Sequence, residues 1–190
     1  MDTAYINRRN KIHPWKFALW IGCGSITMMF AAWTSAYVVR HASGNWLEFK
    51  MPSMFFASTV IIILSSILLH ISYLSFKKGN EVLYKTGLVF TAILGLVFIV
   101  SQYMGWQQLK SIGVPLTLNP SGDFLYVLTG FHAAHVLGGI AVLIVALFHA
   151  FGLKYNPTPK RLLRFELTIT YWHFVGLLWI YLLFFVLSQS

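Results

Sequence analysis

Five long hydrophobic runs without Asp, Glu, Lys or Arg constrain the fold of this 190-residue chain more than any other feature. They span residues 17–39, 54–76, 86–108, 124–153 and 167–188. A helix of about 20 apolar residues can cross the hydrocarbon core of a bilayer, and every run is long enough to do so. Because only short segments separate the runs, no soluble domain fits between them. The sequence therefore predicts a polytopic membrane protein.

The membrane-spanning elements are expected to be helices. A helix satisfies its own backbone hydrogen bonds in lipid, and the runs lack the alternating pattern of about ten residues that marks an outer-membrane barrel. We predict an all-α fold with one membrane domain over residues 1–190, in which a tail at 1–14 precedes a bundle of five helices. The helices are expected at about 15–39, 54–76, 84–108, 124–153 and 166–188.

The basic residues divide unevenly between the two sides of such a bundle. Most of the 14 lie before the first run, between the second and third, or between the fourth and fifth, and only Arg40, Lys50 and Lys110 lie elsewhere. Loops rich in Lys and Arg stay in the cytoplasm, so we predict a cytoplasmic N-terminus and a C-terminus outside. Membrane orientation thus accounts for the net charge of +9, and no nucleic-acid partner is expected.

The hydrophobic runs contain no acidic residue and a single cysteine, Cys23. All five acidic residues lie outside the hydrophobic runs: Asp2, Glu48, Glu81, Asp123 and Glu166. Proton relays and ion sites use ionisable groups at membrane depth, so the sequence argues against a self-contained pathway of either kind. Cys23 is the only cysteine, which excludes an intrachain disulfide and a cysteine-ligated cluster.

Histidine is the remaining candidate for binding a metal. His149 is expected near the cytoplasmic face, where His173 or His70 could join it in ligating a haem. The chain would then be a small membrane cytochrome b, which is the alternative hypothesis. His132 and His135 are expected near the outer face, where no other helix offers a histidine, and we interpret them as hydrogen-bonding structural residues.

A helical wheel separates two faces of the fourth run. Gly130, Ala134 and Gly138 recur at four-residue intervals and predict a stripe for close helix packing. On roughly the opposite side lie His132 and His135, together with Gly139. The partner of this histidine face stays open between a helix of this chain, a lipid headgroup and another subunit. Small residues in the first run, including Gly22 and Gly24, are likewise interpreted as packing positions.

Two dense motifs occupy the last two runs. Residues 165–175 read F-E-x-x-x-x-Y-W-H-F-V and are followed by Trp179, and residues 129–139 read T-G-F-H-x-x-H-V-x-x-G. Weaker matches are Thr59, Ser65, Ser66, Gln102 and the pattern at 36–40. Together these features resemble subunit III of the haem-copper terminal oxidases, in its short five-helix form.

The resemblance implies a non-catalytic subunit of a proton-pumping respiratory oxidase in the cytoplasmic (inner) membrane of a bacterium. Such a subunit binds subunit I directly, shares the complex with subunit II, stabilises the catalytic subunit and supports its proton supply. It is expected to hold phospholipid and no cofactor of its own, since haem and copper belong to partner subunits. The electron donor, cytochrome c or quinol, stays open because it binds other subunits.

The resemblance also assigns structural, interface or lipid-contacting roles to eight side chains and no catalytic role to any. They are Gln102, His132, His135, Glu166, Tyr171, Trp172, His173 and Trp179. Three positions depart from the family pattern, because Ile26, Gly105 and Gly176 stand where many members carry a carboxylate. Roles that depend on those carboxylates do not transfer to this chain.

Overall fold

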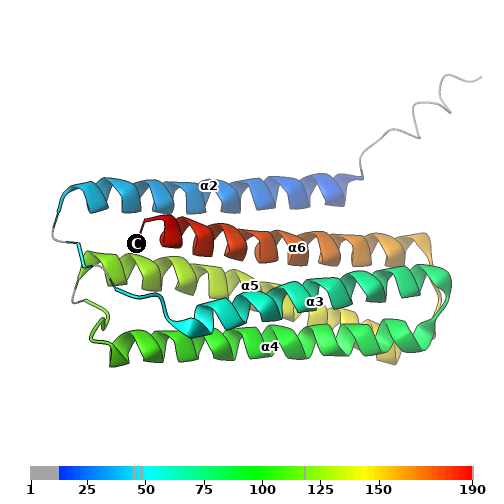
Figure 1. Cartoon of the computed structure of the whole chain (residues 1–190). Coiled ribbons are helices and arrows are strands. Elements are labelled where there is room, and N and C mark those ends of the chain that lie inside the picture. The colour runs from blue at the N-terminus through cyan, green and yellow to red at the C-terminus, as the bar shows by residue number, and fades with distance from the viewer. Residues whose placement is uncertain (1–12, 45, 48, 118, 190) are drawn as a thin grey trace, which may run out of the picture.

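The computed structural model describes residues 13–44, 46–47, 49–117 and 119–189, and residues 1–12 of the predicted tail lie outside them. Within these ranges the chain forms five α-helices and no strand (Figure 1). They are α2 (Pro14–Ala42), α3 (Ser53–Lys78), α4 (Glu81–Ser111), α5 (Pro120–Gly152) and α6 (Pro159–Ser188). Each is long and apolar enough to cross a membrane, which confirms the predicted all-α membrane fold.

The helices extend beyond the hydrophobic runs because polar caps determine where they begin. α5 begins at Pro120, where the Asn119 side chain accepts a hydrogen bond from the Ser121 backbone N–H at 3.0 Å. α6 begins at Pro159 rather than at about residue 166, and Thr158 caps it in the same way. In both helices proline occupies the first turn, where a missing N–H costs nothing.

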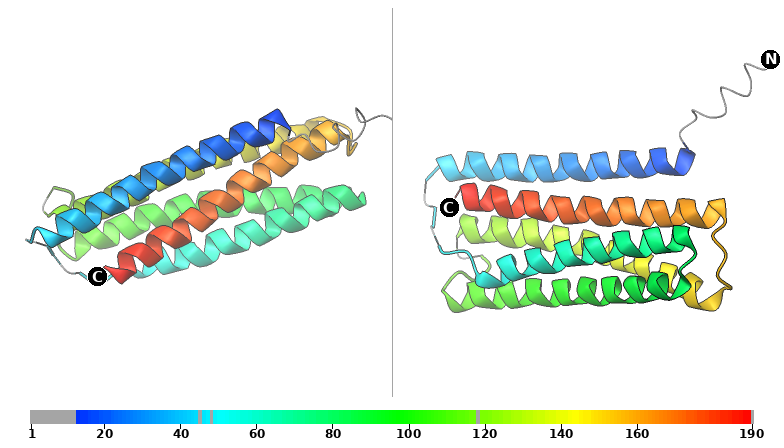
Figure 2. Two further views of the ribbon diagram at one scale, coloured as in Figure 1. Left: turned by 90° about the horizontal axis from the view of Figure 1, so that it is seen from above. Right: turned by 45° about the vertical axis from the view of Figure 1, so that its right-hand side comes forward.

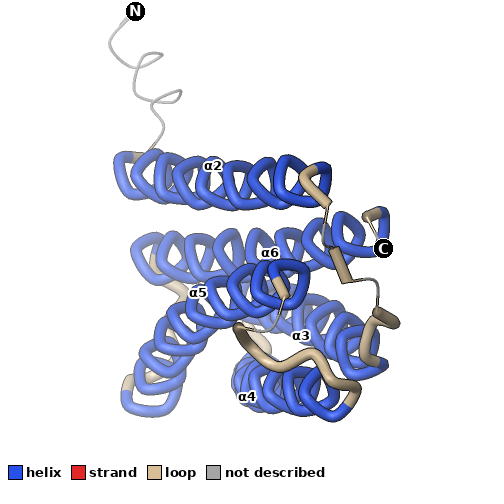
Figure 3. The backbone as a smooth tube through the Cα atoms, turned by 90° about the vertical axis from the view of Figure 1, so that its left-hand side faces the viewer, coloured by secondary structure: helices blue, strands red, loops and turns tan. Residues whose placement is uncertain are grey.

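The helices form a bundle with α2 at one edge and α4 at the other. α6 contacts α2, α3 and α5, and α4 contacts α3 and α5 (Figures 1 and 2). Among the described helices α2 contacts only α5 and α6, and it lies apart from the α3–α4 pair in Figure 3. α2 is therefore the helix that the rest of the bundle holds least.

The connections α3–α4 and α5–α6 lie at the same end of the bundle as the start of α2 (Figure 1). We call this the basic end after the cationic residues that gather there: Lys16, Lys77, Lys78, Lys85, Lys154, Lys160, Arg161 and Arg164. The C-terminus lies at the opposite end. Most of the described cationic residues therefore lie at one end of the bundle axis, as expected when successive loops lie at alternate ends.

Aromatic side chains fill the centre, and glycines admit the largest of them. Trp172 on α6 is 1% exposed. A Cβ at Gly95 on α4 would lie 2.8 Å from its Cη2 atom, and a Cβ at Gly139 on α5 would lie 3.0 Å from its Cε3 atom. The indole thus occupies a slot that a residue larger than glycine at position 95 or 139 would narrow. The outer surface is apolar too, with Phe148 and Phe184 over 70% exposed, as lipid contact requires.

Candidate functional site

The aromatic motif of α6 is attached to α3 by two indole hydrogen bonds. Trp172 Nε1 donates to Ser65 Oγ at 2.8 Å, and Trp179 Nε1 donates to Thr59 Oγ1 at 2.9 Å. The two tryptophans are two turns apart on one face, and the acceptors follow the antiparallel course of α3. An indole N–H buried in lipid needs an acceptor. The weak sequence matches at Thr59 and Ser65 are therefore the partners of the strong motif.

His132 is buried inside the bundle and bonds to a helix of this chain. Its side chain is 0% exposed, and Nε2 donates to the Val175 carbonyl of α6 at 2.9 Å. The ring packs against Trp179 and Phe98, with centroids 5.1 and 5.8 Å away. Nδ1 is buried and has no partner among the described residues. The partner of His132 is thus the backbone of α6, and the hydrogen bond links α5 to α6.

His135 lies on a different side of α5 and faces α2. Its Nδ1 donates to the Phe131 carbonyl one turn earlier at 2.7 Å, and its ring lies 5.8 Å from that of Phe30 on α2. Tyr171 of α6 donates from its hydroxyl to the His135 carbonyl at 3.0 Å. The two histidines of the motif therefore serve separate helix contacts and do not converge on one point.

Gln102 joins α4 to α3 within the same buried layer. Its Nε2 donates to Ser58 Oγ at 2.9 Å, while its Oε1 is buried without a partner among the described residues. A side-chain hydrogen bond of this kind is one of the few polar forces that hold helices together in lipid. Gln102 therefore acts in helix association within the chain.

The predicted packing stripe on α5 was wrong for contacts within this chain. No atom of the described residues lies within 4 Å of a Cβ built at Gly130, and one built at Gly138 meets only the Tyr171 hydroxyl among them, at 3.6 Å. Close approach instead occurs on the opposite face, at Gly139. Gly22 and Gly24 of α2 are also open, with no atom within 4 Å of a built Cβ. The reason is that the Trp172 indole packs against α5 on the face that carries Gly139, and only a glycine there leaves room for it.

Glu166 joins three helices near the basic end. Its Oε1 accepts a hydrogen bond from the Tyr73 hydroxyl of α3 at 2.7 Å, and its Oε2 lies 2.5 Å from Lys16 Nζ of α2. Sequence reasoning singled out Glu166 but missed both partners. Lys16 carried a usable signal, since it is a cation expected at the same membrane depth.

The three histidines considered as haem ligands separate into two groups. The rings of His70 and His173 are 5.9 Å apart and line a groove of about 510 Å³ between α3 and α6. His149 lines a different cavity and donates from Nδ1 to its own Val145 carbonyl at 2.8 Å. The pairing required for a cytochrome b is therefore not favoured. Within the described ranges no three His, Cys, Asp or Glu residues gather into a metal site.

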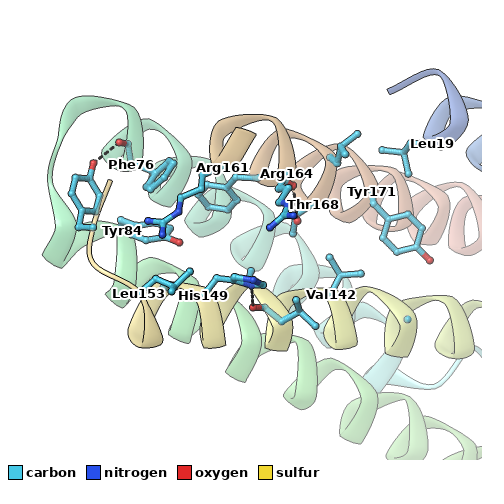
Figure 4. A pocket seen from close by; sticks show the side chains of 17 residues that line it. Leu19, Phe76, Tyr84, Val142, His149, Leu153, Arg161, Arg164, Thr168 and Tyr171 are labelled. Carbon is cyan, nitrogen blue, oxygen red and sulfur yellow. Dashed lines mark hydrogen bonds between the residues drawn. The ribbon is translucent and has the colours of Figure 1, made fainter. Parts of the chain in front are cut away.

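The cavity beside His149 has a volume of about 770 Å³ and lies mainly between α5 and α6, with Leu19 of α2, Phe76 of α3 and Tyr84 of α4 also lining it (Figure 4). Its cationic part holds Arg161 and Arg164 at the start of α6, and Arg161 also donates to the Lys154 carbonyl at 2.7 Å. Farther along, aliphatic residues such as Val142 and Leu19 line it. A slot with a cationic end and an apolar body matches an anionic lipid headgroup with its acyl chain.

Ile26, Gly105 and Gly176 are the positions at which the resemblance led us to expect a carboxylate. The Phe55 ring fills the space at Gly105, since a Cβ there would lie 2.9 Å from Phe55 Cε1. Ile26 packs against the hydrophobic core. Gly176 lies on the floor of the groove between α3 and α6. Gly105 and Ile26 are thus part of apolar packing, whereas Gly176 opens onto the groove that also contains Ser66, His70 and His173.

Comparison with known proteins places this chain beside one family. The family model described as cytochrome c oxidase subunit III matches residues 47–189. A cytochrome c oxidase subunit 3 from Corynebacterium diphtheriae is 29% identical over 161 residues, covering 80% of this chain and 77% of the relative. A probable cytochrome c oxidase subunit 3 from Nocardia farcinica is 26% identical over 185 residues, covering 92% and 86%. Another from Mycobacterium tuberculosis is 29% identical over 183 residues, covering 94% and 89%.

The family match runs through α3, α4, α5 and α6, and thus includes both motifs and the serine and threonine residues that accept their indole hydrogen bonds. The chain belongs to the cytochrome c oxidase subunit III family.

Proposed function

We propose that this chain is the non-catalytic subunit III of a proton-pumping oxidase, and that it binds subunit I directly and shares the complex with subunit II. One observation carries the proposal: the polar residues of the motifs are used in contacts between helices. Trp172, Trp179 and His132 each bond to another helix of the chain. Residues committed to such bonds stabilise a scaffold. The subunit then supports proton supply by holding the catalytic subunit in place.

Haem and copper belong to the partner subunits in this proposal, and the chain itself binds phospholipid. The support for lipid is the cavity between α5 and α6, where His149, Arg161 and Arg164 face an apolar slot. A phosphate group is attracted to guanidinium and imidazole donors, and acyl chains match the aliphatic lining. The lipid would fill the gap that α2 leaves beside α5 and α6.

The complex lies in the cytoplasmic membrane of a bacterium, with the basic end of this subunit in the cytoplasm. Support comes from the gathering of cationic residues at that end and from the bacterial origin of the three relatives. The relatives are named as cytochrome c oxidase subunits, which favours cytochrome c as the electron donor of the complex.

Purification of the tagged chain in mild detergent tests the proposal. We expect a haem-bearing subunit to co-purify, detectable in a reduced-minus-oxidised spectrum and by mass spectrometry. Recovery of the chain as a lone homo-oligomer, without a haem-bearing partner, would overturn it. A haem b spectrum from the isolated chain would instead support the cytochrome b alternative.

A further inference from the structure

The groove between α3 and α6 has the shape of a seat for a helix. Ile63, Ile67 and His70 line it on α3, one turn apart from one another, and His173, Leu177 and Ile180 line it on α6 in the same way. Such rows of side chains form the two ridges between which a third helix packs. The apolar ridge residues are well exposed, with Ile67 at 51% and Leu177 at 67%.

The floor of this groove is low because Gly176 has no side chain. A Cβ at that position would lie 3.4 Å from Ser66 Oγ and 3.7 Å from Ile62 Cγ1, which is ordinary contact. A side chain entering from outside therefore meets Ser66 and the two imidazoles. These three are the polar residues among those that line the groove, and the others are aliphatic or glycine.

His70 and His173 differ from the other three histidines of α3, α5 and α6. The rings of His132, His135 and His149 each bond to a backbone carbonyl. Neither the His70 nor the His173 imidazole forms a hydrogen bond to any described residue, although their rings are 5.9 Å apart. A polar group that faces hydrocarbon without a partner is costly. The pair therefore needs a partner beyond the described residues.

The depth of the pair distinguishes among candidate partners. His70 precedes the end of α3 at Lys78 by two turns, roughly 12 Å along the axis. A lipid headgroup at the membrane surface does not reach that depth, and an acyl chain offers no hydrogen bond. Two imidazoles also fall short of the three or four protein ligands that hold a metal such as zinc.

We propose that the groove docks a transmembrane helix of another subunit of the oxidase, and that this helix presents a carboxyl, amide or hydroxyl group to His70 and His173. The inference rests on the proposed function, since it requires an oxidase complex. The inference adds to that function the face of this chain that contacts the other subunit. It also adds the kind of side chain that the other subunit presents to His70 and His173. The interhelical hydrogen bonds then give the contact its register, because apolar packing alone does not fix it in lipid.

A double substitution tests the hydrogen bonds. In membranes that contain the whole complex, His70→Leu with His173→Leu is expected to lower the haem recovered per tagged chain at least tenfold. Replacing both by Gln, which retains hydrogen-bonding groups, should restore most of it. A matched pair on the lipid-facing side of α4, Leu96→Ala with Val100→Ala, should leave recovery within twofold of wild type. Unchanged recovery with the leucine pair would overturn the inference.

Photo-cross-linking tests the location independently. A benzophenone residue at Ile67 or Leu177 is expected to cross-link to another oxidase subunit. Cross-links only to phospholipid, or only to a second copy of this chain, would overturn the assignment of the groove. If the wild-type chain itself co-purifies with no haem-bearing subunit, the proposed function fails. If wild type succeeds while the groove tests fail, only the docking site is wrong.

Discussion

Glu166 of α6 and Lys16 of α2 form an ion pair with 2.5 Å between Oε2 and Nζ, and this pair attaches the most weakly held helix to the bundle. The same carboxylate accepts a hydrogen bond from Tyr73 of α3. Among the described residues, the other side-chain hydrogen bond between α2 and α6 joins Thr34 and Tyr181 at 3.0 Å, nearer the opposite end. α2 is therefore fixed to α6 at two points along its length, and Leu19 of α2 lines the cavity between them.

Replacing Glu166 should loosen α2 selectively. In Glu166→Gln the ion pair is lost while a hydrogen bond to Tyr73 can persist. Because both partners are over one-third exposed, the pair itself contributes about 1 kcal/mol or less. We expect faster hydrogen exchange in the first turns of α2 and unchanged exchange in α4. Lys85→Met, which removes the Lys85–Glu81 pair within α4, is the matched control and should leave α2 unaffected. Equal exchange rates in Glu166→Gln and wild type would contradict the role given to Glu166.

Glycines that face Trp172 should not tolerate a side chain, whereas glycines with free space beside them should tolerate one. Gly95→Ala places a Cβ 2.8 Å from the indole, so we expect a loss of about 1–3 kcal/mol of stability. Gly130→Ala, in the predicted stripe, meets nothing within 4 Å and should change stability little. Thermal unfolding followed by tryptophan fluorescence measures both. A larger loss for Gly130→Ala than for Gly95→Ala would mean that the stripe packs within the chain after all.

His132 and His135 should differ strongly on truncation, although they lie one turn apart. His132→Ala leaves a space between α5 and α6 and removes the bond to the Val175 carbonyl, so we expect a loss of about 2–4 kcal/mol. His135→Ala removes a bond to its own helix and an edge contact with Phe30 at a partly exposed site, and should cost about 1 kcal/mol or less. Detergent-solubilised variants compared by thermal unfolding give the two values. Similar losses for both would show that burial does not distinguish them.

The number and the ends of the helices were predictable from the sequence to different degrees. Runs of apolar residues identify membrane crossings because lipid excludes charge. They do not identify helix ends, because Thr158 caps α6 well outside its hydrophobic run. The notable side chains were predictable for a similar reason: polar and aromatic residues stand out in an apolar helix.

The faces of those helices were less predictable, because a helical wheel gives angles but not partners. The small residues Gly130 and Gly138 suggested the packing side of α5, yet Trp172 enters at Gly139 instead. Which face is buried depends on the largest side chain of a neighbouring helix. For His70 and His173 the sequence likewise predicted only a similar depth in the membrane. It did not predict that their rings lie 5.9 Å apart, because α3 and α6 are far apart in sequence.

Removing one cation should weaken lipid retention in the cavity between α5 and α6. Arg164→Ala removes a guanidinium that lines the cavity, whereas Arg161 also holds the α5–α6 connection and is a poorer choice for substitution. We expect the phospholipid that co-purifies with the complex, measured by mass spectrometry, to fall by about one molecule per chain, because a phosphate loses one charged donor. Lys110→Ala, at the end of the bundle away from the cavity, is the control and should retain the wild-type lipid content. Full retention of lipid in Arg164→Ala, with loss in Lys110→Ala, would assign the bound lipid to the opposite membrane face.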